Sequence, residues 1–224
     1  MGLMDGKVTL VTGSGRGIGR AVAMDLAAAG AKVVVNDFGS GLHGETTDQT
    51  PADEVVAEIK AAGGEAVANQ GSVAEAADAA RMVQDAVESF GRIDAVVNVA
   101  GILRDAYFHK MTDEEWKAVV DVHLNGTYNV SRAAMDHFRP QKLGAFVHFT
   151  STSGLVGNAG QANYAAAKMG IVGLSRVIAM EGARANVRSN CISPFAWTRM
   201  IEAIPVTSDE MADAFDKFRR NASA

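Results

Sequence analysis

Val8-Thr9-Leu10-Val11-Thr12-Gly13-Ser14-Gly15-Arg16-Gly17-Ile18-Gly19 is the segment that decides the fold of this chain. It begins with a short apolar run, which is typical of a buried strand, and continues into a turn with four glycines. A helical pattern follows from Ala21 to Ala29, and Gly30 ends it. The segment therefore predicts a strand, a tight turn and a helix in immediate succession.

The same alternation of apolar runs and helical patterns continues along the chain. Further strands are expected at residues 32–37, 66–68, 93–97, 145–149 and 187–192, and further helices at 51–62, 73–90, 113–138, 162–183 and 208–220. Strands that alternate with helices over short connections indicate a parallel sheet covered on both faces. We predict an α/β fold, a Rossmann-type doubly wound parallel sheet in three αβα layers, with a single domain over residues 1–224.

The helix expected at 113–138 carries signals at both of its ends. Thr112-Asp113-Glu114-Glu115 matches a capping box, in which the threonine and the second glutamate each bond a backbone amide of the other. Pro140 has no amide hydrogen to donate inside a helix. The sequence therefore predicts that this helix ends before Pro140.

The composition excludes several classes of function. The 224 residues are 48% hydrophobic and 21% charged, with a net charge of −5 and a single cysteine, so neither a nucleic-acid partner nor an intrachain disulfide is expected. No apolar stretch approaches the roughly 18 residues of a membrane span, and the amino terminus has no signal-peptide pattern. We expect a soluble, cytoplasmic protein with no membrane partner. The histidines show no metal-ligand spacing, so no metal is expected either.

The glycine-rich turn has the pattern of a dinucleotide site. In a doubly wound fold the first turn between strand and helix holds a pyrophosphate, and glycines let the backbone approach it closely. The expected cofactor-binding residues of this turn are Gly13, Arg16, Gly17, Ile18 and Gly19. Asp37 ends the second strand at the spacing where an acid bonds the ribose hydroxyls, and its charge would repel a 2′-phosphate. Arg16 would favour NADP, because its cation could pair with the 2′-phosphate. The carboxylate of Asp37 outweighs this, and we expect NAD.

A second constellation lies further along the chain. Tyr164 and Lys168 are four residues apart, so on a helix they share one face. A neighbouring ammonium favours the phenolate and so lowers the pKa of the tyrosine. Lowering this pKa from about 10 to near 7 takes roughly 4 kcal/mol, which the ammonium and the charge of a bound nicotinamide could supply together. Ser151 follows an apolar run and could bond a substrate oxygen. Taken alone, a pair of this kind is more often an incidental pair on a solvated face.

The two constellations together resemble the short-chain dehydrogenase/reductase family. The matching motifs are Thr12-Gly-x-x-x-Gly17-x-Gly19, Asn98-Val99-Ala100-Gly101, Ser151 and Tyr164-x-x-x-Lys168. The resemblance implies that Ser151 orients the substrate oxygen, Tyr164 exchanges the proton, and Lys168 lowers the pKa of the tyrosine and bonds the nicotinamide ribose. It also implies cofactor contacts from Val73, Asn98, Ala100, Gly101 and Thr198.

Further motifs are similar to a narrower group, the (3R)-hydroxyacyl-CoA dehydrogenase domains of peroxisomal multifunctional enzymes type 2 and their bacterial relatives. They include Val35-Asn36-Asp37 with the insertion at 39–50, Ile102-Leu103-Arg104-Asp105, and residues 157–164. This likeness implies NAD-dependent oxidation of a 3-hydroxyacyl-CoA to a 3-oxoacyl-CoA. A hydroxysteroid is the alternative substrate, and a catalytically weak NAD-binding or scaffold protein is the alternative function.

Two departures from the family pattern bear on these expectations. His123 stands where the family usually has an asparagine that anchors a water in a proton path from the lysine, and the imidazole could carry that relay itself. After Met200 only one helical pattern remains, so the sequence is expected to lack the family's usual last helix and strand, as in a truncated product or an incomplete record.

The two long helices also predict self-association. The helices at 113–138 and 162–183 carry apolar residues on more than one side, which for a surface helix implies a partner. The resemblance implies a four-helix interface between two copies. We expect a homodimer or homotetramer through these helices.

Overall fold

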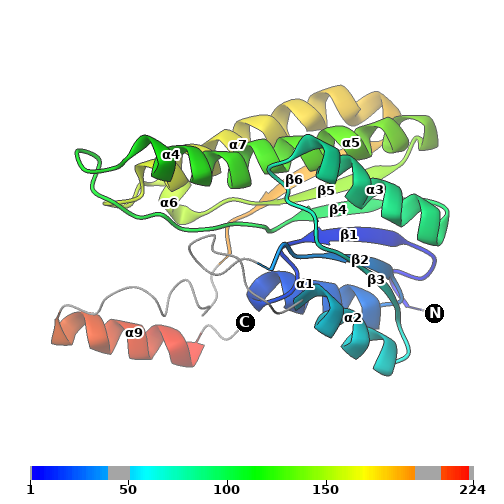
Figure 1. Cartoon of the computed structure of the whole chain (residues 1–224), viewed down its shortest axis with the longest axis horizontal. Coiled ribbons are helices and arrows are strands. Elements are labelled where there is room, and N and C mark those ends of the chain that lie inside the picture. The colour runs from blue at the N-terminus through cyan, green and yellow to red at the C-terminus, as the bar shows by residue number, and fades with distance from the viewer. Residues whose placement is uncertain (1, 40–50, 195–207, 222–224) are drawn as a thin grey trace.

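The computed structural model describes residues 2–39, 51–194 and 208–221, and its strands form one parallel sheet. The strands are β1 (Val8–Thr12), β2 (Lys32–Asn36), β3 (Glu65–Asn69), β4 (Ala95–Asn98), β5 (Gly144–Phe149) and β6 (Val187–Ile192). Their order in the sheet is β3-β2-β1-β4-β5-β6, which is the doubly wound arrangement that the sequence predicts (Figure 1). No seventh strand occurs among the described residues. The assignment of residues 1–224 to a single domain stays a prediction.

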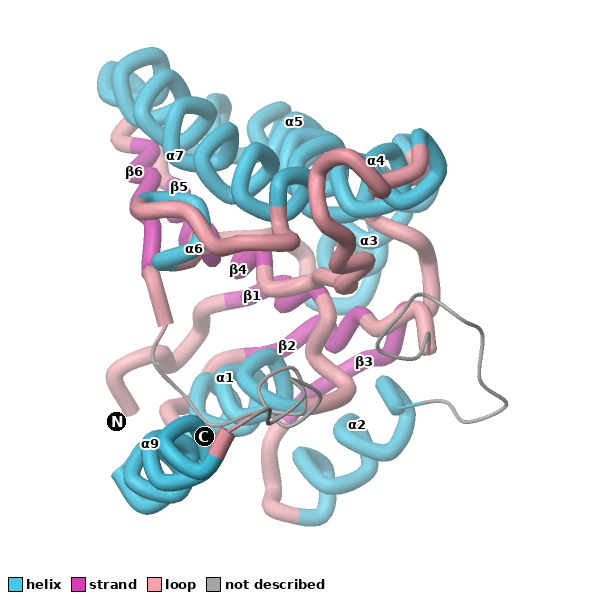
Figure 2. Tube along the Cα trace, turned by 90° about the vertical axis from the view of Figure 1, so that its left-hand side faces the viewer, coloured by secondary structure: helices cyan, strands magenta, loops and turns pink. Residues whose placement is uncertain are grey.

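Helices cover the two faces of the sheet (Figures 1 and 2). One face carries α1 (Gly17–Ala28) and α2 (Pro51–Ala61), and the other carries α3 (Ala76–Phe90), α4 (Asp113–Val120), η1 (Asp121–Asn125), α5 (Gly126–Gln141) and α7 (Ala162–Gly182). The remaining elements are α6 (Thr152–Leu155), η2 (Ala183–Ala185) and α9 (Asp209–Asn221). The three-layer αβα prediction is therefore confirmed.

The central strands are apolar runs because both of their faces are buried. Every residue of β1 is buried, with Val8 and Leu10 in the core on the α3 and α5 side and Val11 in the core on the α1 and α2 side. On the first side, the rings of Phe138 and Phe146 pack with their centroids 5.0 Å apart. Successive side chains of one strand thus hold both helical layers onto the sheet.

The long helix expected at 113–138 is divided by a π-helical turn and runs further than predicted. The capping box at its start is confirmed, because Thr112 and Glu115 each bond the backbone amide of the other. The turn η1 separates α4 from α5. The predicted end before Pro140 is wrong, since α5 continues to Gln141. Pro140 leaves only the carbonyl of residue 136 without its helical donor, and Asp136 is exposed, so water can replace that donor.

The last paired row of the sheet is polar from one edge to the other. The strand register places six residues side by side: Asn69, Asn36, Thr12, Asn98, His148 and Cys191. These side chains bond the segments that leave the strands. Asn36 Nδ2 donates to the Gly71 carbonyl at 3.0 Å, and Thr12 Oγ1 accepts from the amides of Val99 and Ala100 at 3.1 and 3.3 Å.

His148 is the centre of a buried polar chain that starts in this row. The Asn98 amide nitrogen lies 3.2 Å from Ser131 Oγ on α5 and 3.1 Å from His148 Nδ1. On the other side of the imidazole, His148 Nε2 lies 3.1 Å from Ser189 Oγ, which is 2.8 Å from Ser175 Oγ on α7. Burial lowers the pKa of His148 to about 4, so the imidazole is neutral at pH 7.

This burial predicts an acid-sensitive fold. The unfolded chain takes up a proton on His148 near pH 6.5, whereas the folded chain does so only near 4, so the free energy of unfolding falls as the pH drops between these two values. The loss is on the order of 3 kcal/mol for this group. His148→Gln should reduce the dependence on pH between 6.5 and 4, as measured by urea unfolding followed by circular dichroism at a series of pH values.

The matched control is His109→Gln, since His109 is exposed. That variant should keep the wild-type dependence on pH. The same dependence in His148→Gln as in the wild type would mean that His148 does not govern it.

Candidate active site

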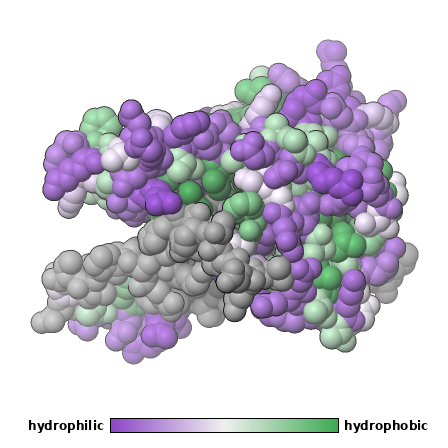
Figure 3. Space-filling model, viewed as in Figure 1, coloured by the Kyte–Doolittle hydropathy of each residue, from purple (hydrophilic) through white to green (hydrophobic). Residues whose placement is uncertain are grey.

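A cleft of about 460 Å³ opens at the carboxyl ends of the parallel strands. Segments that follow β1, β2, β3, β4 and β5 line it, together with residues of α4, η1 and α7. Figure 3 shows apolar surface in the recess below the upper helical layer. Ligands of doubly wound sheets bind at this edge, where the connections of neighbouring strands diverge to opposite faces.

Most of the residues singled out from the sequence meet in this cleft. Its wall includes Gly13, Arg16, Gly17, Ile18, Gly19, Asp37, Val73, Ala100, Gly101, His123, Tyr164 and Lys168. Asn98 differs, because its side chain is buried in the polar chain to His148 and does not line the cleft. Ser151 borders the cleft through its neighbour Thr150 and its bond to Tyr164. Thr198 lies outside the described residues.

The glycine-rich turn leaves room for a ligand against the backbone. Gly13 and Gly17 have φ values of 62° and 52°, which side chains disfavour. A Cβ added at Gly13 would also lie 2.6 Å from Ala100 Cα. No side chain caps α1, so its first amides have no helical partner and face an anion site at the positive end of the helix. The turn thus fits the diphosphate of a dinucleotide.

Asp37 holds the loop beside this turn. Its Oδ2 accepts from the Gly15 amide at 2.9 Å, and its Oδ1 accepts from the Gly39 amide at 2.8 Å. Each carboxylate oxygen has a further lone pair. Asp37 can therefore brace the loop and still accept from the hydroxyls of a ribose in the cleft.

Lys168 is buried where α7 crosses the end of β5. Its Nζ donates to the Phe149 carbonyl at 2.6 Å and lies 5.5 Å from the centre of the Tyr164 ring. The Thr150 hydroxyl donates to the Lys168 carbonyl at 2.8 Å, which fixes the helix against the strand end. Burial lowers the pKa of Lys168 to about 7, although Cys191 raises it. The amine can therefore gain and lose a proton at neutral pH.

The electrostatics of Tyr164 differ from the expectation drawn from the sequence. Burial raises its pKa above the usual value, a hydrogen bond with Ser151 lowers it, and the charge of Asp105 raises it. Lys168 does not bring the pKa of the phenol toward 7 here. The amine instead donates to the Phe149 carbonyl, with its Nζ 5.5 Å from the centre of the Tyr164 ring.

His123 lies in the π-helical turn η1, edge-on to Tyr164, with the ring centroids 5.0 Å apart. Its Nε2 is 2.8 Å from the Ile102 carbonyl, and its buried Nδ1 has no partner among the described residues. Burial, and to a lesser extent the charge of Lys168, lower the pKa of His123 to about 3. The hydrogen bond with the backbone of Ile102 raises this pKa by a smaller amount. An imidazole with this pKa stays neutral at pH 7. It can accept a hydrogen bond but does not store a proton.

Gly101 is required by this histidine. A Cβ at position 101 would collide with the imidazole, because its Nδ1 and Nε2 both lie 3.0 Å from that position. The glycine after Ala100 therefore makes room for His123, as well as lining the cleft.

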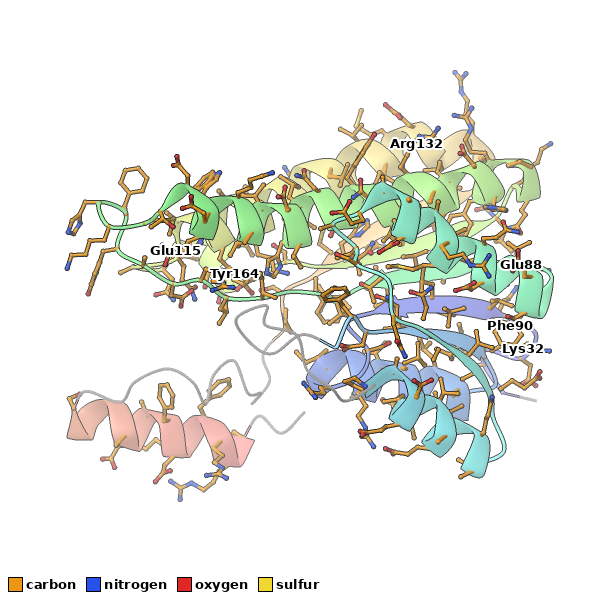
Figure 4. The ribbon with its side chains drawn as sticks, in the orientation of Figure 1. Lys32, Glu88, Phe90, Glu115, Arg132 and Tyr164 are labelled. Carbon is orange, nitrogen blue, oxygen red and sulfur yellow. The ribbon has the colours of Figure 1, made fainter. Side chains whose placement is uncertain are left out.

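Asn163 joins three segments at the start of α7. It is not among the catalytic or cofactor-binding residues predicted from the sequence. Its amide nitrogen donates to the carbonyls of Arg104 and Glu115 at 2.9 and 3.1 Å, and its oxygen accepts from the Tyr164 amide at 2.7 Å. Figure 4 shows Tyr164 near the part of α4 that carries Glu115. These hydrogen bonds fix the first turn of α7, which carries Tyr164.

The neighbouring residues are held in the same way. Gln161 donates to the Asp105 carboxylate at 2.9 Å, and the Ala106 amide donates to the Gly160 carbonyl at 2.9 Å. A run of amide side chains before Tyr164 is the only sign of this arrangement in the sequence. Residues 102–106, which we call the clamped segment, are therefore fixed onto the start of α7.

Within residues 2–39, 51–194 and 208–221, no group of three acidic, histidine or cysteine side chains could hold a metal ion. None of the helices described there is long and apolar enough to cross a membrane.

Comparison with known proteins agrees with this geometry. Residues 7–205 match the family described as short chain dehydrogenase. A Mycobacterium tuberculosis protein named as a short-chain type dehydrogenase/reductase is 52% identical over 198 residues, which are 88% of this chain and 69% of that protein. A crystal structure of a short chain dehydrogenase from Mycobacterium avium has a TM-score of 0.82 at 46% identity and covers 87% of this chain and 72% of that one.

A multifunctional relative shares the same region. The peroxisomal multifunctional enzyme type 2 of Mus musculus is 50% identical over 200 residues, which are 89% of this chain but only 27% of the mouse protein. This chain thus spans about a quarter of the length of that relative. On its sequence motifs, its fold and these likenesses, the chain belongs to the short-chain dehydrogenase/reductase family of oxidoreductases, which act on CH–OH groups and generally use a nicotinamide cofactor.

Proposed function

We propose that this chain is an NAD-dependent dehydrogenase that interconverts a 3-hydroxyacyl-CoA and a 3-oxoacyl-CoA. The observation that carries the proposal is the cleft itself, which Tyr164 and Lys168 line together with the glycine-rich turn and Asp37. The bound nicotinamide supplies or accepts the hydride. The remaining chemistry is the transfer of one proton to or from the substrate oxygen.

The side chains of the cleft are suited to that proton transfer. Ser151 holds the phenol oxygen of Tyr164 by a hydrogen bond and can do the same for a substrate oxygen beside it. Tyr164 would give or take the proton as general acid or base. Lys168, with its pKa near 7, would pass the proton onward. His123 would accept a hydrogen bond from water on that path through its unpartnered Nδ1.

The names of relatives and two exposed apolar side chains support an acyl substrate. The relatives include a peroxisomal hydratase-dehydrogenase-epimerase of Saccharomyces cerevisiae and a 3-oxoacyl-[acyl-carrier-protein] reductase of Synechocystis, at 50% and 43% identity. Phe108 and Val156 expose large apolar surface on the segments after β4 and β5. Such surface can receive a hydrocarbon chain.

We further propose that two copies associate through α5 and α7. Met169, Val177 and Met180 recur at the spacing of one face of α7 and are exposed by 48%, 50% and 78%. Tyr128 on α5 is exposed by 52%. A second copy that covers these side chains would also brace the helix that carries Tyr164. Association as a dimer or a tetramer agrees with this surface.

Replacement of the phenol should test the proton donor. Tyr164→Phe should reduce kcat with 3-hydroxyacyl-CoA by about a hundredfold or more, because the ring still packs but the proton-carrying oxygen is lost. NAD affinity, measured by fluorescence titration, should stay unchanged. Tyr128→Phe is the matched control and should keep full activity. Activity of Tyr164→Phe close to that of the wild type would contradict the assignment.

Removal of the Asp37 charge should test the choice of cofactor. Asp37→Asn keeps one of the two oxygens that accept from the loop amides and removes the charge that repels a 2′-phosphate. The ratio of kcat/KM for NAD over NADP should fall by about tenfold or more, because a charge pair a few ångströms apart is worth several kcal/mol near a protein surface. An unchanged ratio would show that the carboxylate does not face the ribose.

A charge on the exposed face of α7 should test the assembly. Val177→Glu should convert the oligomer into a monomer in light scattering at micromolar concentration, because the carboxylate would be buried without a partner. Ala57→Glu, at an exposed position of α2, should leave the mass unchanged. A wild-type chain with the mass of a monomer would end the proposal.

A further inference from the structure

Arg104 lines the cleft and has a buried donor that no described residue satisfies. Arg104 lines the same cleft as Tyr164. Its Nε is buried, yet it has no hydrogen-bond partner in the part of the chain that the structure describes. An unpaired buried N–H of this kind costs about 1–3 kcal/mol. Buried donors are almost always paired, so an unpaired one in a cleft indicates a ligand acceptor.

The carboxylates around the cleft are engaged elsewhere. Asp37 accepts from two loop amides. Asp121 pairs with Lys117 at 3.2 Å and accepts from Asn125 at 2.8 Å. Asp105, the neighbour of Arg104 in sequence, accepts from Gln161. None of these carboxylates forms an ion pair with Arg104 among the described residues.

The backbone of Arg104 is fixed beside the reacting groups. Its carbonyl accepts from Asn163, the residue before Tyr164, and the clamped segment on both sides of it is tied to His123, Gln161 and Gly160. A guanidinium that starts from a fixed backbone loses less freedom when a ligand binds. Arg104 is therefore preorganised on the substrate side of the cleft, whereas the glycine-rich turn for the phosphates follows β1.

We propose that Arg104 donates to the thioester carbonyl oxygen of the 3-hydroxyacyl substrate, an inference that rests on the proposed function. Such a substrate has an acceptor oxygen two carbons from the carbinol that reacts. Ser151 and Tyr164 serve the carbinol oxygen, so the carbonyl oxygen needs a separate donor. A charge-assisted bond from a guanidinium is among the stronger bonds available to it.

This contact makes Arg104 a specificity-determining residue. A substrate held at both oxygens presents its third carbon to the cofactor, and an alcohol without the second oxygen leaves the guanidinium unpaired. A site built for a hydrogen bond rejects an analogue that cannot form it. The enzyme would thus prefer 3-hydroxy thioesters to simple secondary alcohols of the same length.

The experiment combines one variant with one altered substrate. The substrates are a 3-hydroxyacyl-CoA and its thioether analogue, in which a methylene group replaces the carbonyl. Arg104→Met removes every N–H donor of the side chain and should lower kcat/KM for the thioester by about tenfold to a hundredfold. The wild type should lose a similar factor when the thioether replaces the thioester. Arg104→Met should treat the two substrates alike.

Two controls separate this role from a structural one. NAD affinity of Arg104→Met should match that of the wild type, and Arg184→Met, at an exposed position near the end of α7, should keep the wild-type ratio between the two substrates. Equal loss on both substrates, or weaker NAD binding alone, would overturn the inference. So would a wild type that does not distinguish thioester from thioether, a result that needs no variant.

The same assay distinguishes a failure of the proposed substrate class from a failure of the role assigned to Arg104. A wild type that oxidises another secondary alcohol, such as a hydroxysteroid, but no 3-hydroxyacyl-CoA would refute the proposed function and with it the role of Arg104. A wild type that oxidises the thioester while Arg104→Met remains equally active would refute the role of Arg104 alone.

Discussion

The cleft depends on the polar row that ends the parallel sheet. Parallel pairing brings the carboxyl ends of all strands to one edge, and here the register aligns Asn36, Thr12, Asn98 and His148 across four neighbouring strands. Buried polar side chains are stable only when they are bonded. Their bonds go to the segments that leave the strands and to the helices above them. The row therefore holds the walls of the cleft at fixed positions.

Burial sets the proton chemistry inside the cleft. Removal from water disfavours the charged form of every group, so the pKa of Tyr164 rises while those of Lys168 and His123 fall. Only Lys168 is brought close to neutral pH, and it faces the backbone of β5. These shifts agree with the proposed roles, in which Tyr164 exchanges a proton with the substrate and Lys168 passes it onward.

The clamped segment, residues 102–106, connects η1 with the start of α7 beside the cleft. It leaves β4 in the middle of the sheet and is bonded at successive residues to η1 and to the start of α7. Local motion of the segment would break these bonds together, so Arg104 and Tyr164 keep one relative placement. Precise placement of this kind is what positioning of a substrate requires.

The sequence by itself determined the features that depend on near neighbours in the chain. Apolar runs and helical periods predicted the six strands, their parallel arrangement and the layers of helices, because these patterns reflect burial on one or both faces. The spacing of Tyr164 and Lys168 placed both on one face of α7, and the glycines of residues 13–19 predicted the turn. These inferences need only local geometry, and the structure agrees with each of them.

Only the tertiary structure decided which distant groups meet and how far water is excluded from them. In the tertiary structure the Asn98 side chain contacts His148 and not the cleft, and Lys168 donates to the Phe149 carbonyl. The His123 ring packs directly against Gly101. The Arg104 donor without a partner among the described residues likewise arises from its surroundings, since its neighbour Asp105 bonds Gln161. Hydrogen-bond partners and pKa values depend on atoms brought together from separate segments, and such contacts leave no periodic pattern in the chain.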